Sequence, residues 1–276
     1  MMINRSQLKF HETFQPETVY IARVLELAAN RFSGTKYEIS EQTGIPTGKQ
    51  KGKVEPHIKY ATFMGLIDHQ CDKGNYTLSL TPLGEVVYYE DRFLHENLTR
   101  WLCHYAISRK QAGAPQWAYI VRDGHSGFLS ENSTEHHVNK ANALFGTNVS
   151  AEELFGVVKR SYQEGFFAEL NYLKWDDYVR YIEHNESPEL LYVYAYALLD
   201  SWSQLLPNKQ EITIIELFHS LQIGEVFNLS EESIDSILND LEYDGILKTN
   251  RQLYPSTIIR FVSEQELLSK LYSRLL

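Results

Sequence analysis

The spacing of apolar residues predicts two short helices in the first third of the chain. Residues 36–46 form a short amphipathic segment, and Gly44 stands where a helix would stop with a left-handed residue. A basic connector, residues 47–53, follows it. From Val54 to Ala61, apolar side chains recur at helical spacing, and Gly65 suits a C-terminal cap. We therefore expect a helix on either side of the connector.

Beyond Gly65 the period of the pattern changes from helical spacing to two. Tyr76, Leu78 and Leu80 alternate with polar residues after a turn at residues 72–75, which predicts a tight β hairpin at 66–80. The order helix, turn, helix and hairpin is typical of a winged helix, a variant of the helix-turn-helix.

Helices on both sides complete the predicted N-terminal domain, residues 1–92. A long helix is expected over 17–32, with a buried face of alanine, valine and leucine. After the hairpin, Thr81 suits an N-cap and Pro82 a first helical position, which predicts a helix running to about Asp91.

Residues 93–205 are predicted to form a helical middle domain. The segments with helical spacing are 94–105, 135–145, 151–164, 176–184 and 189–204. Residues 116–121 fit a strand or a buried helix, and periodicity does not separate the two. The segment 189–204 is apolar almost all round and is expected at a domain centre.

The winged pattern recurs in residues 206–276. We expect helical elements over 212–221 and 223–228, a strong helix from Ser230 to Gly245, a small hairpin over 246–254 around Asn250, and a last helix over 263–276. The predicted fold class is therefore mainly α with small β hairpins, in which two winged-helix domains flank a helical middle domain.

Composition places the chain among soluble globular proteins, with 43% hydrophobic and 22% charged residues. No apolar run approaches the roughly 20 residues that span a bilayer, and the N-terminus lacks the apolar core of a signal peptide. Cys71 and Cys103 form neither a disulfide framework nor a zinc cluster. We expect a cytoplasmic protein without a membrane partner.

The distribution of charge singles out the connector. The formal net charge of −10 opposes indiscriminate binding to DNA, which is a polyanion. Between Thr47 and Lys59, however, four lysines stand against Glu55 alone. Because salt screens charges beyond about 8 Å at physiological ionic strength, such a local cluster can still meet phosphates.

These lysines define a candidate site for double-stranded DNA. We expect the helix after the connector to bury Val54, Ile58 and Ala61 and to turn Lys59, Tyr60 and Phe63 outward. Its predicted DNA-binding residues are Lys49, Lys51, Lys53, His57, Lys59, Tyr60 and, at the tip of the wing, Lys73. The lysines would position the duplex through phosphates, and Lys59, Tyr60 and His57 would supply specificity.

The corresponding helix of the C-terminal copy has the opposite charge. Between Ser230 and Gly245 it carries six acids and no base, and the acids are residues 231, 232, 235, 240, 242 and 244. Phosphate would repel that face. We expect this copy to contact proteins or to form a homodimer, because a fold by itself does not confer DNA binding.

Catalytic chemistry is not indicated by any motif. The glycine- and lysine-rich connector lacks the spacing of a phosphate-binding loop, and no nucleophile elbow or paired-cysteine site is present. The pair His11-Glu12 fits a polar lock beside Phe10 and Phe14 better than a metal site. His136 and His137 fit surface positions. We expect no enzyme activity, no cofactor and no metal.

Two sequence blocks give a family resemblance. Phe10-His-Glu-Thr-Phe14 and Gly52-Lys-Val-Glu-Pro-His57, together with Met64-Gly-Leu-Ile67, resemble an uncharacterised prokaryotic family. Its members are often encoded beside sulfurtransferases similar to phosphoadenosine-phosphosulfate reductase and beside DNA phosphorothioation and defence genes. The resemblance implies an accessory role in DNA modification or phage defence, with a sulfurtransferase or an ATPase as partner, and it implies no catalytic residues.

Three functions remain in view. The first is a non-enzymatic DNA-binding accessory protein of a modification or defence system. The second is a winged-helix transcriptional regulator of a neighbouring operon, which symmetric half-sites in bound DNA would favour. The third is a protein-interaction scaffold that does not bind DNA, in which the basic connector is only a solvated loop.

Overall fold

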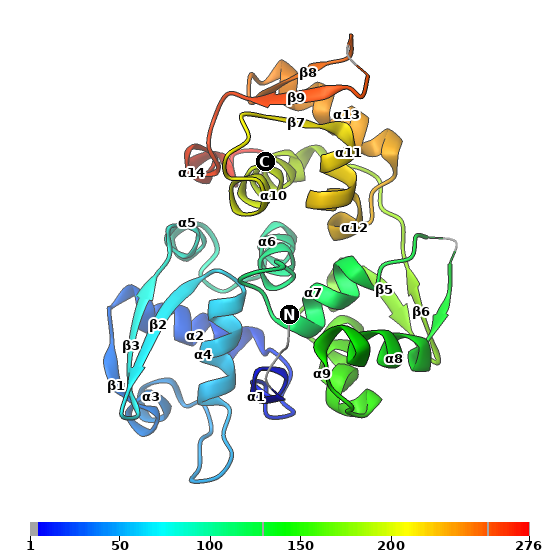
Figure 1. The fold of residues 1–276 in the computed structure, drawn as a ribbon. Coiled ribbons are helices and arrows are strands. Elements are labelled where there is room, and N and C mark those ends of the chain that lie inside the picture. The colour runs from blue at the N-terminus through cyan, green and yellow to red at the C-terminus, as the bar shows by residue number, and fades with distance from the viewer. Residues whose placement is uncertain (1–4, 129, 253, 276) are drawn as a thin grey trace. The chain divides into compact units, whose positions relative to one another are not determined.

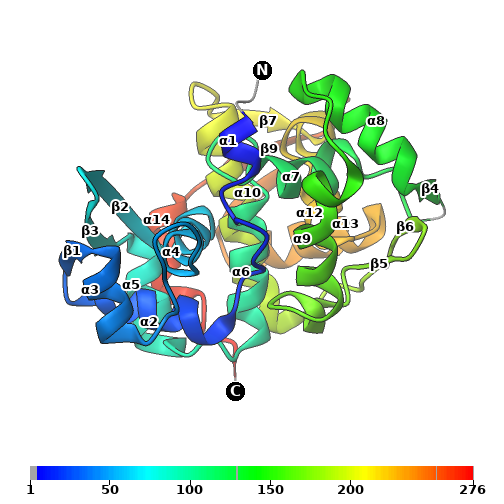
Figure 2. The ribbon, with the colours of Figure 1, turned by 90° about the horizontal axis from the view of Figure 1, so that it is seen from below.

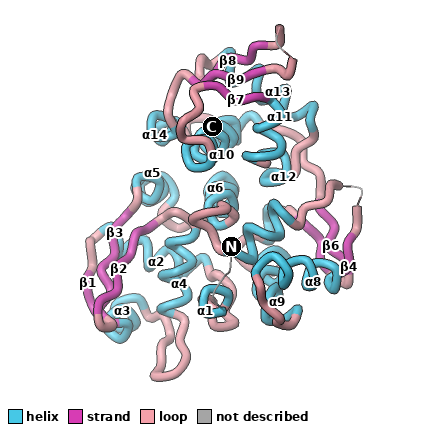
Figure 3. The backbone as a smooth tube through the Cα atoms, viewed as in Figure 1, coloured by secondary structure: helices cyan, strands magenta, loops and turns pink. Residues whose placement is uncertain are grey.

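The computed structural model describes residues 5–128, 130–252 and 254–275, and its chain divides into two compact units. Unit 1 ends at Tyr181 and unit 2 begins at Ile182. Helices form most of both units, and the strands are short and antiparallel (Figures 1 and 3), which confirms the predicted class of a mainly α fold with small β elements. The C-terminal residue of the predicted last helix, Leu276, and Leu253 of the predicted hairpin lie outside the described residues.

Unit 1 begins with α1 (Arg5–Leu8), and a first module, residues 18–91, follows. The module consists of α2 (Thr18–Ala29), β1 (Ser33–Thr35), α3 (Lys36–Thr43), α4 (Val54–Phe63), β2 (Ile67–Asp72), β3 (Asn75–Leu80) and α5 (Pro82–Asp91). Its sheet has the order β1-β3-β2, and the β2–β3 register runs from Ile67 opposite Leu80 to Asp72 opposite Asn75. The hairpin predicted at 66–80 is confirmed.

Local sequence signals fix the ends of these elements. Thr35 and Glu38 form a reciprocal capping box at the start of α3, and Gly44 ends that helix in the left-handed region with φ of 66°. Thr81 caps α5, as predicted. Helix α2 packs against α4 and β3, so that Leu25, Ile58 and Leu78 are all fully buried in one core.

The rest of unit 1 forms a second module, residues 97–181. It contains α6 (Asn97–Ile107), α7 (Pro115–Ala118), the π-helix η1 (Tyr119–Asp123), β4 (Asn132–Ser133), α8 (Thr134–Phe145), α9 (Ala151–Gln163), η2 (Ala168–Leu170), β5 (Leu173–Trp175) and β6 (Tyr178–Tyr181). The segment 116–121, which fitted a strand or a buried helix, is helical and mostly buried. Helices α8 and α9 pack against each other (Figure 2).

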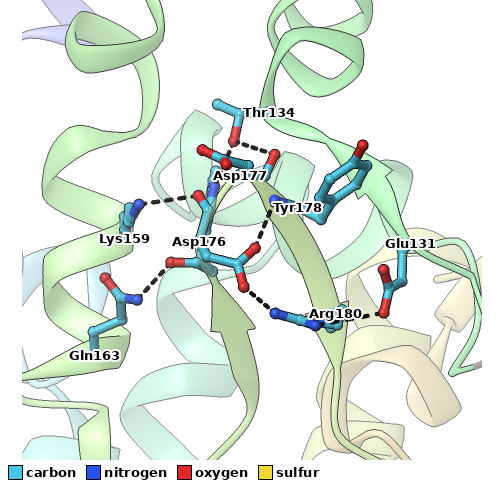
Figure 4. Close-up of polar contacts among 9 residues, drawn as sticks. Glu131, Thr134, Lys159, Gln163, Asp176, Asp177, Tyr178 and Arg180 are labelled. Atoms are coloured by element: carbon cyan, nitrogen blue, oxygen red, sulfur yellow. Dashed lines mark hydrogen bonds and ion pairs between the residues drawn. The ribbon is translucent and has the colours of Figure 1, made fainter.

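The helix predicted over 176–184 is wrong, because residues 176–181 form the turn and second strand of the β5–β6 hairpin and residues 182–184 are not helical either. Asp176 holds the turn: its carboxylate accepts from the backbone N–H of Tyr178 at 2.9 Å and pairs with Arg180, and its carbonyl accepts from Lys159 at 3.1 Å (Figure 4). The strands have only three or four residues, which is too short for a two-residue period to emerge from the sequence.

Unit 2 contains a third module, residues 191–270, preceded by η3 (Pro188–Leu190). It consists of α10 (Leu191–Leu205), β7 (Glu211–Thr213), α11 (Ile214–Glu216), the π-helix η4 (Leu217–Leu221), α12 (Ile223–Phe227), α13 (Glu231–Tyr243), β8 (Leu247–Asn250), β9 (Thr257–Arg260), α14 (Glu264–Leu267) and η5 (Leu268–Lys270). The predicted apolar helix α10 packs against α13 and α14.

Three details of the C-terminal prediction are wrong. The segment 212–221 begins with β7 before it becomes helical. The hairpin does not turn around Asn250, because β8 ends there and β9 begins only at Thr257. The last helical segment ends at Lys270 instead of continuing toward the C-terminus, and turns follow it.

All three sheets of the described residues share one strand order. The first strand of each module pairs with the third, and the third pairs with the second, which gives β1-β3-β2, β4-β6-β5 and β7-β9-β8. In each module two or more helical segments separate the first strand from the hairpin. The sequence predicted this recurrence for the C-terminal residues but not for the middle of the chain.

Candidate nucleic-acid interface

The loop between α3 and α4, residues 44–53, has a closed shape. Its ends are joined by the backbone N–H of Lys53, which donates to the carbonyl of Pro46 at 2.7 Å. At Gly52 a Cβ would lie 2.5 Å from Thr47 Oγ1, so only glycine fits this turn. The loop therefore presents Lys49 and Lys51, both exposed, from a defined backbone.

The three lysines of the loop differ in their partners. Lys53 is half-buried, and its ammonium pairs with Glu17 at 2.7 Å and lies 5.3 Å from the ring centre of Tyr20. Lys49 and Lys51 form no ion pair with any residue that the structure describes. Of the three predicted phosphate contacts, Lys49 and Lys51 have free charges, whereas the charge of Lys53 is neutralised.

The predicted outward orientation of Tyr60 is wrong. Tyr60 is fully buried, its hydroxyl donates to the carbonyl of Phe14 at 2.8 Å, and its ring lies 5.0 Å from that of Phe10. The N-terminal segment that contains these two phenylalanines covers this side of α4. Nothing in the local spacing of α4 shows that a segment 46 residues earlier in the chain covers it.

His57 is also fully buried and is not a flanking contact. Its Nδ1 donates to the carbonyl of Lys53 at 2.6 Å, and its Nε2 accepts from the backbone N–H of Glu17 at 3.1 Å. Burial lowers the pKa of His57 to about 4. The neutral imidazole thus joins the start of α2 to the start of α4 and holds the base of the loop.

The exposed stripe that remains on α4 is narrow. Glu55 pairs with Lys36 at 3.0 Å and accepts from the Tyr76 hydroxyl at 2.8 Å, so its charge is compensated. Lys59 is exposed and lacks an ion-pair partner within the described part of the chain. Phe63 is half-buried. Of the side chains that were expected to point outward from α4, only the Lys59 ammonium and part of the Phe63 ring are therefore accessible.

The tip of the β2–β3 hairpin lies near the first turn of α4. Lys73 and Gly74 form the turn with φ of 48° and 83°, and the Lys73 side chain is exposed. The contact between Tyr76 and Glu55 brings the hairpin to the start of α4, close to the end of the loop (Figure 1). Lys49, Lys51 and Lys73, which we call the loop-hairpin lysines, thus project from two neighbouring segments of the first module.

The sequence suggested that the acids of α13 are all uncompensated, but three of them lie close to an arginine. Arg251 lies 3.4 Å from Asp235 and 3.9 Å from Glu242, and Arg274 pairs with Asp244 at 2.7 Å. Glu231, Glu232 and Asp240 remain exposed without an ion pair in the described residues; we call them the α13 acids. This face is therefore acidic, as predicted, but three of its six carboxylates have an arginine partner.

Two histidine predictions have different outcomes. His11 is buried beside Phe10 and accepts from the backbone N–H of Thr13 at 3.1 Å, and Glu12 accepts from Gly52 at 3.5 Å, which fits the predicted polar lock. His137 is not a surface residue, because it is buried against Tyr119. Its helix α8 packs on α9, which covers that face.

In the part of the chain that the structure describes, no three His, Cys, Asp or Glu side chains gather in a way that could hold a metal ion. Among the same residues, no helix has the length and apolar character needed to cross a membrane.

Fold and site together define a mainly helical protein with small antiparallel sheets and an exposed basic edge on its first module. The chain belongs to the family described as "Protein of unknown function (DUF4007)", whose model matches residues 9–265. That result agrees with the predicted membership of an uncharacterised family. No curated protein matches the sequence.

Solved structures similar to this chain include two of a protein named SspB. The crystal structure of magnesium ion-bound SspB has a TM-score of 0.74, is 15% identical, and is matched over 97% of this chain and 88% of that chain. A second SspB crystal structure has a TM-score of 0.74, 16% identity and the same coverage. At such identity the likeness establishes a shared fold.

Proposed function

We propose that this chain is a non-enzymatic, DNA-binding accessory protein of a prokaryotic DNA-modification or defence system. The observation that carries the proposal is the group of loop-hairpin lysines, which are exposed and unpaired among the described residues in a chain of net charge −10. The family resemblance on the His-Glu-Thr-Phe and Gly-Lys-Val-Glu-Pro blocks supplies the biological setting, DNA phosphorothioation or phage defence.

In this proposal the first module is a winged helix that contacts DNA through its loop and wing. Helix α4 does not read bases in the manner of a recognition helix, because Tyr60 and His57 are buried. Lysines meet phosphates as point charges and fix position more than sequence. We therefore expect binding that depends strongly on salt and weakly on base sequence.

The third module, a second winged helix in this proposal, contacts proteins. The α13 acids repel phosphate but suit a basic partner surface. A sulfurtransferase or an ATPase of the same system is the partner class that the family resemblance implies. A homodimer through the same face is a less favoured arrangement, because two copies of an acidic face repel each other.

The test measures binding of the full chain to two unrelated blunt duplexes by fluorescence anisotropy. We expect similar affinities for both, with an affinity that falls steeply as salt rises. Because one SspB structure contains a magnesium ion, each titration is run with Mg²⁺ and with EDTA. Absence of duplex binding at low salt would refute the DNA proposal, and nicked or cut DNA in the recovered samples would refute its non-enzymatic part.

The same material separates the accessory protein from a transcriptional regulator. Footprinting on the upstream region of the neighbouring operon should give no protected site with two symmetric halves, whereas a regulator would give one. Affinity capture with a purified neighbouring sulfurtransferase or ATPase should retain the chain, and the α13 acids changed to alanine should weaken that retention.

A further inference from the structure

A cavity of about 600 Å³ lies within unit 1, beside α4. That volume falls in the range of small-molecule sites in proteins, which is roughly 300–1,000 Å³. The wall comes from segments far apart in the sequence, which include α4, β2, the 110–119 segment and the end of α8. Some of its lining residues are buried, such as Phe10 and Tyr119, whereas others, such as Lys59, are exposed.

Aromatic rings line the cavity in two pairs. The rings of Phe10 and Phe63 meet edge to face with centres 4.8 Å apart, and those of Tyr119 and Phe145 meet in the same way at 6.1 Å. Phe63 is only half-buried, so part of its ring is accessible to a ligand. A half-exposed ring held by a buried one is a platform on which a nucleobase can stack.

Two exposed lysines stand among the lining residues. Lys59 has no ion pair within the described residues, and Lys110 lies 3.7 Å from Asp123, which is a loose pair in solvent. The two lysines and the aspartate give the lining of the cavity a net positive charge. A purely apolar ligand would leave those cations unused, whereas an anionic ligand with an aromatic part would use cations and rings together.

The backbone beside the cavity has a defined conformation at Gly113. At Gly113 a Cβ would lie 2.4 Å from the carbonyl oxygens of Ile107 and Arg109, and the Gly113 N–H donates to the latter carbonyl at 3.0 Å. Further along the same stretch, Tyr119 and Asp123 belong to the π-helix η1. Single π-turns inside helical segments occur frequently at functional sites.

We propose that this cavity binds one nucleotide, whose base stacks on Phe63 and whose phosphate pairs with Lys59 and Lys110. This inference rests on the proposed function for the source of the ligand, an unpaired nucleotide of a DNA strand, although a free nucleotide has the same chemistry. The site is separate from the loop-hairpin lysines, so the loop would hold the duplex and the cavity would hold an unpaired base.

The first experiment uses free ligands and the full chain. Deoxyadenosine 5′-monophosphate, deoxyadenosine and inorganic phosphate are titrated by calorimetry. We expect the monophosphate to bind most tightly. Changing the exposed Lys59 and Lys110 together to alanine should weaken binding of the monophosphate on the order of tenfold, because it removes the charge contacts with the phosphate. Phe63→Ala should weaken that binding by a similar factor, because it removes the ring on which the base stacks. Phe63→Trp should retain binding.

The controls separate this proposal from the DNA proposal. Lys174→Ala, an exposed lysine on β5 outside the cavity, should not change nucleotide binding, and neither should alanine at Lys49 and Lys51. A duplex with an unpaired 3′ end should bind more tightly than a blunt duplex, and free nucleotide should remove only that difference. Equal binding of both duplexes with intact nucleotide binding would assign the cavity to free nucleotides.

Two outcomes would overturn the nucleotide site. One is no detectable heat with millimolar monophosphate, while duplex binding through the loop remains. The other is nucleotide binding that persists unchanged in both the Lys59/Lys110 variant and the Phe63→Ala variant, with thermal melting showing that both variants are folded.

Discussion

The first and third modules have the same framework and opposite surfaces. Both start the helix after the first strand with a threonine–glutamate capping box, at Thr35–Glu38 and at Thr213–Glu216. Both end the helix before the hairpin at a glycine with positive φ, 71° at Gly65 and 69° at Gly245. Yet the first module displays the loop-hairpin lysines, and the third displays the α13 acids.

This comparison separates what the framework needs from what the surface does. Caps, positive-φ glycines and buried apolar positions recur because each module must end its helices and close its sheet at the same places. Exposed charges are free of those constraints, so one scaffold can meet phosphate in one copy and protein in the other. Changes to the framework should therefore have large effects on stability, and changes to the surface should have smaller ones.

The largest expected effect concerns the helix after each hairpin. In the first module Gly84 stands at the third position of α5, where a Cβ would lie 1.7 Å from the carbonyl oxygen of Leu66. Gly84→Ala must displace α5 or the backbone before β2, and we expect a loss of about 3 kcal/mol in the free energy of unfolding, measured by urea denaturation.

The matched change in the third module should reduce the free energy of unfolding much less. Glu266 holds the equivalent position of α14 and is half of an exposed capping box, so Glu266→Ala removes a surface hydrogen bond without displacing backbone. If Gly84→Ala and Glu266→Ala lose equal amounts of unfolding free energy, then α5 is not packed more tightly at this position than α14.

The second prediction concerns pH. His57 occupies the fourth residue of α4, and Ile234 occupies the fourth residue of α13; both are buried. Because the folded pKa of His57, about 4, is below the ordinary 6.5, the unfolded chain binds more protons between these values. Stability is then full above about pH 6.5 and falls as pH drops toward 4, by up to about 1.4 kcal/mol per pH unit from this one group.

His57→Ile should weaken the dependence of the free energy of unfolding on pH. His11 and His137 have pKa values lowered in the same direction by burial and keep their own contribution in the variant. The measurement is urea denaturation at pH 7 and pH 5. If the variant loses as much stability as wild type between these two values, then protonation of His57 is not linked to unfolding.

How much of the first module could be predicted depends on how local each signal is. Thr35, Gly44, the turn at residues 72–75 and Thr81 act within a few residues, and the sequence predicted the elements that they delimit. The burial of Tyr60 and His57 could not be predicted in that way, because Phe14 and Glu17, which contact them, come 40 or more residues earlier.

The remaining errors of prediction also come from features that local spacing does not show. The strands β5 and β6 are too short to alternate visibly, and the acids of α13 are paired by Arg251 and Arg274, which follow the helix after intervening elements. Of the candidate site, the sequence correctly placed Lys49, Lys51, Lys59 and Lys73 at exposed positions. Phe63 and Lys110 come to line one cavity only in the fold, and no sequence signal joins them.

The third prediction compares the two capping boxes. Thr35→Ala and Thr213→Ala each remove a side-chain acceptor from a helix start, and each should lose about 1 kcal/mol. Hydrogen exchange resolves which module is affected: each variant should raise exchange in its own module. If only one variant changes exchange, the two caps are not equivalent.

The smallest expected effect is on the acidic face. Changing the α13 acids to alanine should leave duplex affinity within about twofold of wild type, with a slight gain where like-charge repulsion is relieved. Anisotropy titrations at one salt concentration suffice. A large loss of affinity in a variant that melts like wild type would show that this face takes part in DNA binding.

The central claim, that the first module meets DNA through the loop-hairpin lysines, is tested most directly by a salt series. Duplex affinity is measured for wild type, for Lys49, Lys51 and Lys73 changed together to alanine, and for a control with alanine at the exposed Lys174 and Lys248. Each lost phosphate contact should make the log–log salt slope shallower by about 0.9, so the triple variant should differ by about two to three. Equal slopes and equal affinities for the triple variant, the control and wild type would contradict the claim.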